Sequence, residues 1–394
     1  MTEFENRPPF GASDTDLPSD FAELRESIPA CEDVSYFNTG ATGPSPAFLL
    51  DAVDDWNRFH KTDVLVSGDA YEVGFDAYDS CRERIAPFLG ANPEEIALTE
   101  STADGLSAVL AAIDWNADDV IVTTDLEHPA ADVPLARLRR HHDVTVRRVE
   151  TDAGRIDTEA FAEAVADARV AVLSSLAWNY GTRLPTAELV EIADDAGAFT
   201  LVDAVQEPGQ CPVDLSKWGA DAVVGSGHKW LLGVWGSGFL YVADDASEEL
   251  RPAQVSYRSV EDPETSGRGS GYELKSGAAR FERGTAAIGP HVGFTESVRL
   301  FESLGVESIR AEILRLTERL TEQIPTERLL SPSEPETGLV TVNVAEPEAT
   351  VERLADAGFA VRSLPDPDSV RVSVHCFNSE GEVDGLAEEL TDEF

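Results

Sequence analysis

Between residues 95 and 243 the chain alternates short β-rich apolar runs with segments that carry apolar residues at helical spacing. This alternation is typical of βαβ units and predicts a mostly parallel sheet covered by helices. Helices are expected over 158–168 and over 186–196, where the second begins after Pro185 and ends at Gly197. The expected strands are Ile96–Thr99, Val120–Thr123, Val170–Ser174, Phe199–Val202, Ala222–Val224 and Gly238–Val242.

After about Thr285 the pattern changes to a long amphipathic helix, about 290–323, followed by strands over 339–344 and 370–374 with helices between them. We expect a second, smaller α+β unit there, and 394 residues suffice for two units. The predicted fold class is therefore α/β, with a mostly parallel mixed sheet in a large domain. The expected division is an N-terminal segment, 1–40, that packs on the small domain or on a partner, a large domain, 41–288, and a small C-terminal domain, 289–394.

The charge balance restricts the possible partners. The chain has 74 acidic and 30 basic residues, a net charge of −44, and only four of the basic residues are lysine. Such a surface repels nucleic acid and anionic lipid. The N-terminus lacks a signal-peptide pattern and no apolar run is long enough to span a membrane, so we expect a cytoplasmic protein without a membrane partner. Because the acidic residues are spread over the whole chain, we hypothesise a very salty, halophilic cytoplasm, with an acidic protein from an ordinary cell as the alternative.

The four cysteines lie far apart in the sequence. Cys31, Cys81, Cys211 and Cys376 form no Cys-x-x-Cys pair and have no nearby histidine cluster. The sequence therefore predicts neither a disulfide framework nor a metal site.

Chemically active residues follow four of the predicted strands. They are His128, Asn179, Asp203 and Lys229. Because the carboxyl ends of parallel strands meet at one edge of a sheet, we expect these side chains to converge. Each could instead be structural: an Asp at a strand end often caps a turn, and His128 could simply cap a helix.

Together these residues match the demands of pyridoxal 5′-phosphate (PLP). Asp203 can keep the pyridine nitrogen protonated, His128 can stack on the ring, and Asn179 and Gln206 can hydrogen-bond the ring hydroxyl. Lys229 supplies the amine that holds the cofactor.

A phosphate site is predicted at the start of the apolar helix that follows residues 100–104. The backbone of Thr102 and Ala103 would supply donors there, and Ser226 and His228 would add side-chain donors.

At this point the sequence resembles the class V aminotransferase family of fold-type I PLP enzymes, in the branch of cysteine desulfurases, selenocysteine lyases and isopenicillin N epimerases. The resemblance covers almost the whole chain, and the Ser-Gly-His-Lys element after Asp-x-x-Gln is its most specific part. The matching segments are Tyr36–Pro44, Leu98–Gly105, Leu126–His128, Val202–Gln206, Ser226–Trp230, Phe281–Thr285 and Arg371–His375.

The resemblance implies a role for each matching residue. Lys229 would form the Schiff base, Asp203 would contact the pyridine nitrogen and His128 would stack on the ring. Arg371 would bind the carboxylate of a small amino-acid substrate, with Ala41 among the substrate contacts. Thr285 would reach the phosphate in the neighbouring subunit, which implies a homodimer with its sites at the interface.

One departure from the family concerns the nucleophilic cysteine of the desulfurases. The corresponding loop, residues 361–369, contains no cysteine and carries two prolines. Strand alternation places Arg371, Ser373 and His375 on one face and Cys376 on the other, which predicts that Cys376 points into the core.

The expected reaction therefore begins with an external aldimine and removal of the α-proton by Lys229, and it leads to C–S β-elimination or epimerisation without a persulfide cysteine. An aminotransferase and a desulfurase with a non-standard cysteine remain alternatives. A PLP-fold scaffold would usually have lost Lys229 or Asp203, and a dinucleotide-binding dehydrogenase would need a Gly-x-Gly-x-x-Gly that is missing after residues 98 and 122.

The sequence allows alternative interpretations of two further elements. The segment 256–275 is interpreted as a lid or interface loop, or as a plain solvated loop. Arg283 would contact a second carboxylate of the substrate or the phosphate of the partner.

Overall fold

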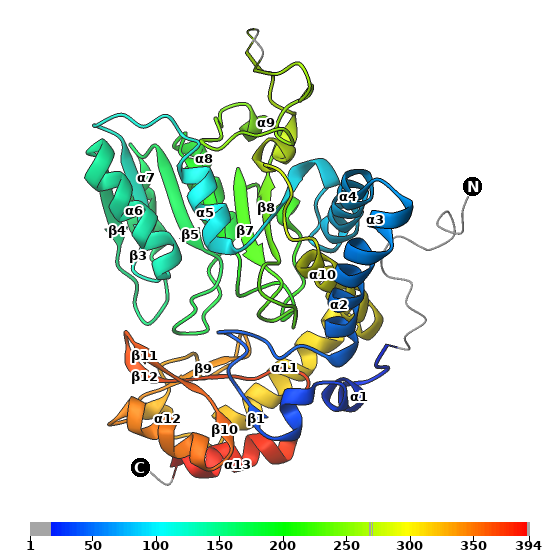
Figure 1. The fold of residues 1–394 in the computed structure, drawn as a ribbon. Coiled ribbons are helices and arrows are strands. Elements are labelled where there is room, and N and C mark those ends of the chain that lie inside the picture. The colour runs from blue at the N-terminus through cyan, green and yellow to red at the C-terminus, as the bar shows by residue number, and fades with distance from the viewer. Residues whose placement is uncertain (1–16, 268, 270, 392–394) are drawn as a thin grey trace.

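A seven-stranded sheet forms the centre of the computed structural model, which describes residues 17–267, 269 and 271–391 (Figure 1). The strand order is β2-β8-β7-β6-β5-β3-β4, in which β8 is antiparallel to both neighbours and all other neighbouring pairs are parallel. This arrangement confirms the predicted fold class. The strands are β2 (Ile96–Thr99), β3 (Val120–Thr124), β4 (Thr145–Val149), β5 (Val170–Ser174), β6 (Phe199–Asp203), β7 (Ala222–Ser226) and β8 (Gly238–Val242).

The sequence pattern predicted every strand of this sheet except β4. β4 is the edge strand beside β3, and it carries two consecutive arginines. Arg147 pairs with Asp167 and Arg148 pairs with Asp132. Charged residues are common on sheet edges because they discourage further pairing, and they remove the apolar alternation by which a strand is recognised.

Helices cover both faces of the sheet. α5 (Thr102–Leu110) and α6 (Pro129–His142) share one apolar cluster with strand residues such as Leu201 and Val224. α7 (Thr158–Val165) and α8 (Thr186–Asp195) pack with Ala171 and Leu173, which belong to a different cluster. The helices expected over 158–168 and 186–196 are thus confirmed, each with its end a few residues or less from the expected one.

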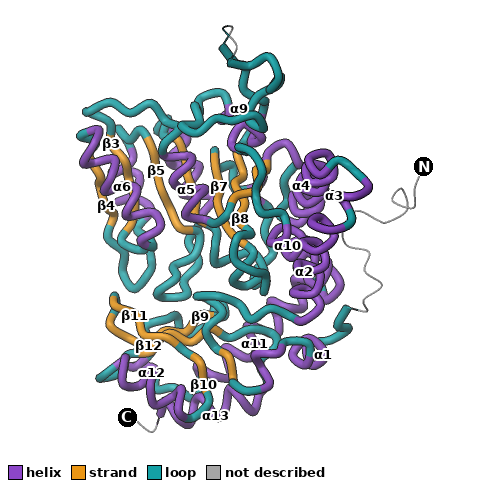
Figure 2. The backbone as a smooth tube through the Cα atoms, in the orientation of Figure 1, coloured by secondary structure: helices purple, strands orange, loops and turns teal. Residues whose placement is uncertain are grey.

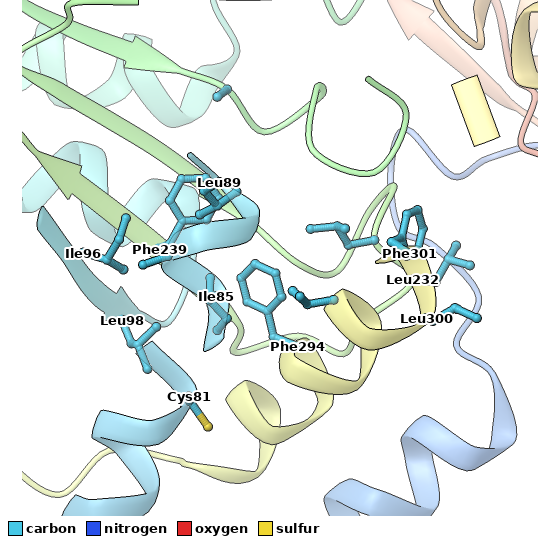
Figure 3. Packing of buried hydrophobic residues seen from close by; sticks show 14 of the residues in the cluster. Cys81, Ile85, Leu89, Ile96, Leu98, Leu232, Phe239, Phe294, Leu300 and Phe301 are labelled. Carbon is cyan, nitrogen blue, oxygen red and sulfur yellow. The ribbon is translucent and has the colours of Figure 1, made fainter. Parts of the chain in front are cut away.

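A third helical group packs beside the antiparallel edge of the sheet. It consists of α2 (Ala47–Thr62), α3 (Val64–Ser67), α4 (Ala70–Phe88) and α10 (Gly289–Leu304). Figure 3 shows part of its core, where Cys81 and Ile85 of α4 and Phe294 of α10 lie with Phe239 of β8.

The prediction of a single long helix over 290–323 is wrong, because this stretch forms two helices. α10 ends at Leu304 and α11 (Val306–Thr321) begins two residues later. Gly305 between them has φ +79°, which is not a helical value and which residues with a Cβ rarely adopt.

A smaller sheet lies across from the carboxyl-end loops of the large one (Figure 2). Its order is β11-β12-β9, all antiparallel, and it packs with α11 and two further helices in a separate apolar cluster. The elements are β9 (Leu339–Val342), β11 (Arg362–Pro365), β12 (Asp368–Ser373), α12 (Pro347–Asp356) and α13 (Glu380–Thr391).

The N-terminal segment joins this smaller unit. β1 (Ser35–Tyr36) pairs in parallel with β10 (Phe359–Ala360), and Phe37 lies in the same apolar cluster as β9 and β12. Residues 1–16 lie outside the described residues, and the role expected for the whole segment 1–40 stays a prediction. The domain boundaries near residues 40 and 288 remain a proposal.

Two further short α-helices are α1 (Phe21–Glu26) and α9 (Asp244–Ser247). None of the helices in the described part of the chain combines the length and apolar character that a membrane crossing requires.

Candidate active site

A cavity of about 230 Å³ lies where the carboxyl ends of the parallel strands face the smaller sheet. Both sheets contribute to its lining, since Asp203 comes from β6 and Arg371 from β12. Of the residues predicted from the sequence, those that line this cavity are Ala41, Thr102, Ala103, His128, Asp203, Gln206, His228, Lys229 and Arg371.

Lys229 follows β7 and lines the cavity. The pKa of the amine is lowered to about 8, chiefly by burial; the carboxylate of Asp203 opposes this shift, and the positive charges of Arg371 and Arg362 contribute to it. An amine with a pKa near neutrality is partly unprotonated, and so it is able to act as a nucleophile or a base.

Asp203 is the last residue of β6, and its side chain is 4% exposed. Oδ1 accepts a hydrogen bond from the backbone N–H of Val205 at 2.9 Å. Burial raises the pKa of the carboxyl group, while Val205 and Lys229 oppose the shift. A buried carboxylate with few donors favours a cationic partner at its remaining oxygen.

His128 both caps a helix and lines the cavity. Its Nδ1 accepts a hydrogen bond from the N–H of Ala130 at 3.2 Å at the start of α6, which leaves the proton on Nε2. Its ring contacts Trp178 edge-on, with centroids 5.2 Å apart. Burial, followed by repulsion from Lys229 and the two arginines, lowers its pKa to about 4, so the ring is neutral at pH 7.

The start of α5 forms a group of donors at the cavity wall. Ser101 caps the helix by accepting from the N–H of Asp104 at 3.1 Å, and Thr102 and Ala103 follow it. Within the described residues, Thr102 Oγ1 is buried and lacks a hydrogen-bond partner. Gly105 allows α5 to lie directly on the sheet, since a Cβ there would come within 2.7 Å of Val224. Free N–H groups and an unused hydroxyl at a helix start suit a phosphate.

Three of the predicted residues do not line this cavity. Ser226 is buried, and its Oγ lies 2.8 Å from Nδ1 of His228. Asn179 turns its Nδ2 toward the carbonyl of Asp366, at 3.3 Å, rather than into the cavity. Thr285 is exposed, and its N–H donates to the hydroxyl of Tyr257 at 2.8 Å.

Gln206 lines the cavity, but its amide is already engaged. Nε2 donates to the carbonyl of Gly40 at 3.0 Å and Oε1 accepts from Trp230 at 2.7 Å. One N–H of the amide remains for a ligand.

Arg283 also lies outside the cavity. It forms an ion pair with Asp104 of α5 at 3.5 Å and a hydrogen bond with Gln254. In the segment 256–275, Arg258 pairs with Asp79 and with the buried Glu282.

Arg362 is a cavity residue that the sequence analysis did not assign. It stands directly opposite Arg371 in the β11–β12 hairpin. The signal was present in the sequence: a two-residue turn at Asp366-Pro367 brings residues 362 and 371 into register. Trp178 lies against Arg371: its ring centroid is 5.9 Å from the guanidinium carbon, and its carbonyl accepts a hydrogen bond from Arg371 at 3.0 Å.

Glu127 is the second missed residue, and it is buried behind His128. Its carboxylate accepts hydrogen bonds from Thr124 Oγ1 at 2.9 Å and from the N–H and Oγ of Ser174 at 3.0 and 2.8 Å. Ser174 lines the cavity and is the register partner of Asp203. Glu127 therefore positions the strand ends that carry the site.

The sequence profile of a family described as aminotransferase class-V matches residues 35–386. The chain belongs to this family. Class-V aminotransferases use pyridoxal phosphate, so this protein is a PLP-dependent enzyme.

Two curated relatives match this chain over most of its length and over most of their own. A probable cysteine desulfurase of Methanothermobacter thermautotrophicus is 28% identical over 393 residues, covering 93% of this chain and 96% of the relative. The isopenicillin N epimerase of Streptomyces clavuligerus is 30% identical over 392 residues, covering 94% and 98%.

Solved structures of C-DES, described as a cystine C-S lyase, have the same fold. Its complex with the product cysteine persulfide has a TM-score of 0.86 and 27% identity, covering 93% of this chain and 99% of C-DES. A variant with glycine covalently linked to the PLP cofactor has a TM-score of 0.87 and 26% identity, covering 94% and 99%.

The residues of the cavity fit this cofactor. The unpartnered hydroxyl of Thr102 and the first N–H groups of α5 suit the phosphate, and the buried carboxylate of Asp203 suits the pyridinium nitrogen. The amine of Lys229 faces the same space.

Proposed function

We propose that this enzyme removes the α-proton of an amino acid with Lys229 as the base and carries out C–S β-elimination or epimerisation without a persulfide-forming cysteine. The observation that carries the proposal is the composition of the cavity. Lys229, Asp203 and Arg371 line it together, whereas no cysteine of the described chain does so.

Each of these side chains would have a separate task. Bound PLP supplies an electron-withdrawing ring that stabilises the negative charge developing on the α-carbon. Asp203 would hold the proton at the ring nitrogen, and the neutral ring of His128 would lie against the ring face. Arg371 would bind the substrate carboxylate, which fixes the α-carbon within reach of Lys229. The lowered pKa of Lys229 favours the unprotonated amine that a base requires.

The positions of the cysteines support a reaction without a thiol nucleophile. Cys31, Cys81, Cys211 and Cys376 are all buried, and burial raises the pKa of each thiol. Cys376 is 1% exposed and packs in the core, as strand alternation predicted. A buried protonated thiol is a poor nucleophile.

The names of the relatives fit both outcomes. One is called an isopenicillin N epimerase and another a cystine C-S lyase, so this fold accommodates each. A transamination, with the proton returned to the cofactor, uses the same residues and is the second candidate. A desulfurase that uses one of the buried cysteines is the third, because a curated relative is called a probable cysteine desulfurase.

The test is a product assay on the purified protein loaded with PLP in molar KCl. L-cysteine, cystine, cysteine sulfoxides and a panel of L- and D-amino acids are supplied, and sulfide, pyruvate, keto acid and optical rotation are followed. Sulfide released together with pyruvate supports the lyase, sulfide without pyruvate supports the desulfurase, and loss of optical rotation alone supports the epimerase. If Lys229→Ala retains full turnover, the proposal is wrong.

We further propose a halophilic, cytoplasmic homodimer. The exposed Thr285 and the adjacent Tyr257 and Arg283 would then face the second subunit near the start of its α5. Sedimentation in molar KCl tests the oligomeric state, and a monomer with full activity would contradict it.

A further inference from the structure

Two arginine side chains face each other in the cavity. Arg362 of β11 and Arg371 of β12 are register partners in an antiparallel hairpin, and both line the cavity wall. Directly opposite residues in such a pair have Cβ atoms about 5 Å apart, and like charges in this position destabilise the sheet. The chain therefore maintains an unfavourable contact at its active site.

Nothing within the described residues neutralises the pair. Neither arginine forms an ion pair there, although the whole chain contains 74 acidic residues and many other arginines are paired. Arg371 is 1% exposed, yet its Nε and Nη2 have no hydrogen-bond partner. For Arg362 the structure shows one hydrogen bond, from Nε to the carbonyl of Ser363 at 3.4 Å. A buried charge without an anionic partner, as at Arg371, is costly unless a ligand supplies the opposite charge, and the half-buried Arg362 adds a second positive charge beside it.

The other charged groups of the cavity do not compensate the two guanidinium groups. Lys229 is a further positive group, and Asp203 is engaged by the N–H of Val205 and attracts Lys229. Burial lowers the pKa of Arg371 to about 9, with Arg362 as the next cause, and only Tyr36 opposes the shift. One substrate carboxylate would balance one of the two arginines and leave the other unbalanced.

Resting on the proposed function, we infer that the substrate is an α-amino acid with a second anionic group on its side chain, which Arg362 binds while Arg371 binds the α-carboxylate. The surroundings suit this division. Gly40 leaves room beside Arg371, since a Cβ at Gly40 would come within 3.1 Å of Nη2. The buried Nε1 of Trp178 also lacks a partner among the described residues and lies on the same wall.

The first test compares acidic amino acids with their amides. L-aspartate and L-glutamate are titrated against the PLP-loaded enzyme at constant KCl, alongside L-asparagine and L-glutamine, and binding is followed by the cofactor spectrum. Because the amides match the acids in shape but lack the second charge, we expect the acids to bind about 30-fold more tightly or better. Equal affinities for acids and amides would overturn the inference.

The second test uses variants. Arg362→Gln should bring acids and amides to within about threefold of each other while the amides keep their wild-type affinity, and Arg371→Gln should weaken both classes. Arg84→Gln, on an exposed ion pair with Glu302 far from the cavity, is the matched control and should change neither. If Arg362→Gln weakens acids and amides equally, Arg362 serves the α-carboxylate and the second-anion site does not exist.

A third measurement separates this inference from the proposed function. Succinate and butyrate have four carbons and no amine, so calorimetric binding of the two to the PLP-loaded enzyme reports the arginine pair without any chemistry. Tighter binding of succinate, lost in Arg362→Gln, supports the pair as a two-anion site even if no amino acid is turned over. Equal binding of succinate and butyrate overturns the inference of a second-anion site, even if the enzyme is an active lyase. This result is expected if a carboxylate of a second subunit already occupies Arg362.

Discussion

Trp230 donates a hydrogen bond from Nε1 to Oε1 of Gln206 at 2.7 Å, and it is the residue directly after Lys229. Gln206 in turn donates to the carbonyl of Gly40 at 3.0 Å. His375 stacks on the indole and its Nε2 lies 3.0 Å from the carbonyl of Trp230. The lysine loop, the loop after β6 and the residues that follow β12 are therefore joined at one buried residue.

Trp230→Ala should destabilise the protein strongly. The indole is fully buried, and loss of a buried tryptophan costs about 3–5 kcal/mol of unfolding free energy. Urea unfolding in molar KCl measures the change. Trp235→Ala is the matched control, because that indole is 75% exposed and its loss should change the stability by less than about 1 kcal/mol. Similar losses for the two variants would contradict the joining role of Trp230.

Gly305→Ala should lower stability through backbone conformation alone. A Cβ at this position meets only Ser308 Oγ, at 3.5 Å, so packing is not the obstacle, but φ +79° costs a residue with a Cβ about 1–3 kcal/mol. Gly381→Ala is the control. It lies exposed in α13 with nothing within 4 Å of the added methyl group, and it should stabilise by up to about 1 kcal/mol. Two variants of equal stability in the same urea titration would be against this account.

The fold was predictable because its strands are buried on both faces. A strand such as β5, buried along its whole length, appears in the sequence as a continuous apolar run. β4 was not predictable in this way, since Arg147 and Arg148 occupy an edge where burial is partial. The break at Gly305 was missed because a single glycine within a helical pattern is often tolerated.

The sequence predicted those cavity residues that stand at strand ends and match a chemical demand of the cofactor. Lys229, Asp203 and His128 follow strands, and strand ends converge by topology. Arg362 required the exact register of a hairpin, and Glu127 required the knowledge that Ser174 and Thr124 enclose it. Asn179 follows a strand as well, but its side chain turns toward Asp366, and side-chain direction in a loop is not encoded in the strand pattern.

The protein without cofactor should gain stability between pH 8 and 10.5. The pKa of Lys229 falls from 10.5 to about 8 in the folded chain. Between these pH values the unfolded chain binds more protons than the folded chain, so the free energy of unfolding increases as pH rises. Lys229→Met removes this dependence. The variant should be more stable than the wild type at pH 7, by on the order of 1–3 kcal/mol, and the difference should shrink toward pH 10. Urea titrations of both cofactor-free proteins at several pH values measure it, and a difference independent of pH would show that the amine is not desolvated.

The stability difference between Glu127→Gln and the wild type should change with pH in the direction opposite to that of Lys229→Met. Burial raises the pKa of this carboxyl group from 4.5 to about 7, against the hydrogen bonds from Ser174 and Thr124. The folded chain then binds more protons than the unfolded chain between these values, so this group's contribution to stability is present below pH 4.5 and declines as pH rises to 7. The amide keeps most of the hydrogen bonds but does not titrate. Relative to the wild type, the variant should therefore gain about 1–3 kcal/mol between pH 5 and 7, and a constant difference would contradict a raised pKa.

Salt dependence should distinguish this chain from an ordinary acidic protein. The chain has a net charge of −44, and its acidic residues lie closer together in the folded state than in the unfolded chain. Their mutual repulsion therefore destabilises the folded state. At about 0.1 M KCl the screening length is about 10 Å, which reaches between neighbouring surface carboxylates, whereas at molar salt it falls to about 3 Å. We therefore expect the unfolding free energy to drop by more than about 2 kcal/mol between molar and 0.1 M KCl. Isothermal urea unfolding across a KCl series measures the drop, and sucrose at low salt is the control, since it favours compact states without screening charge. A stability that sucrose restores as fully as KCl does would mean that screening is not the cause.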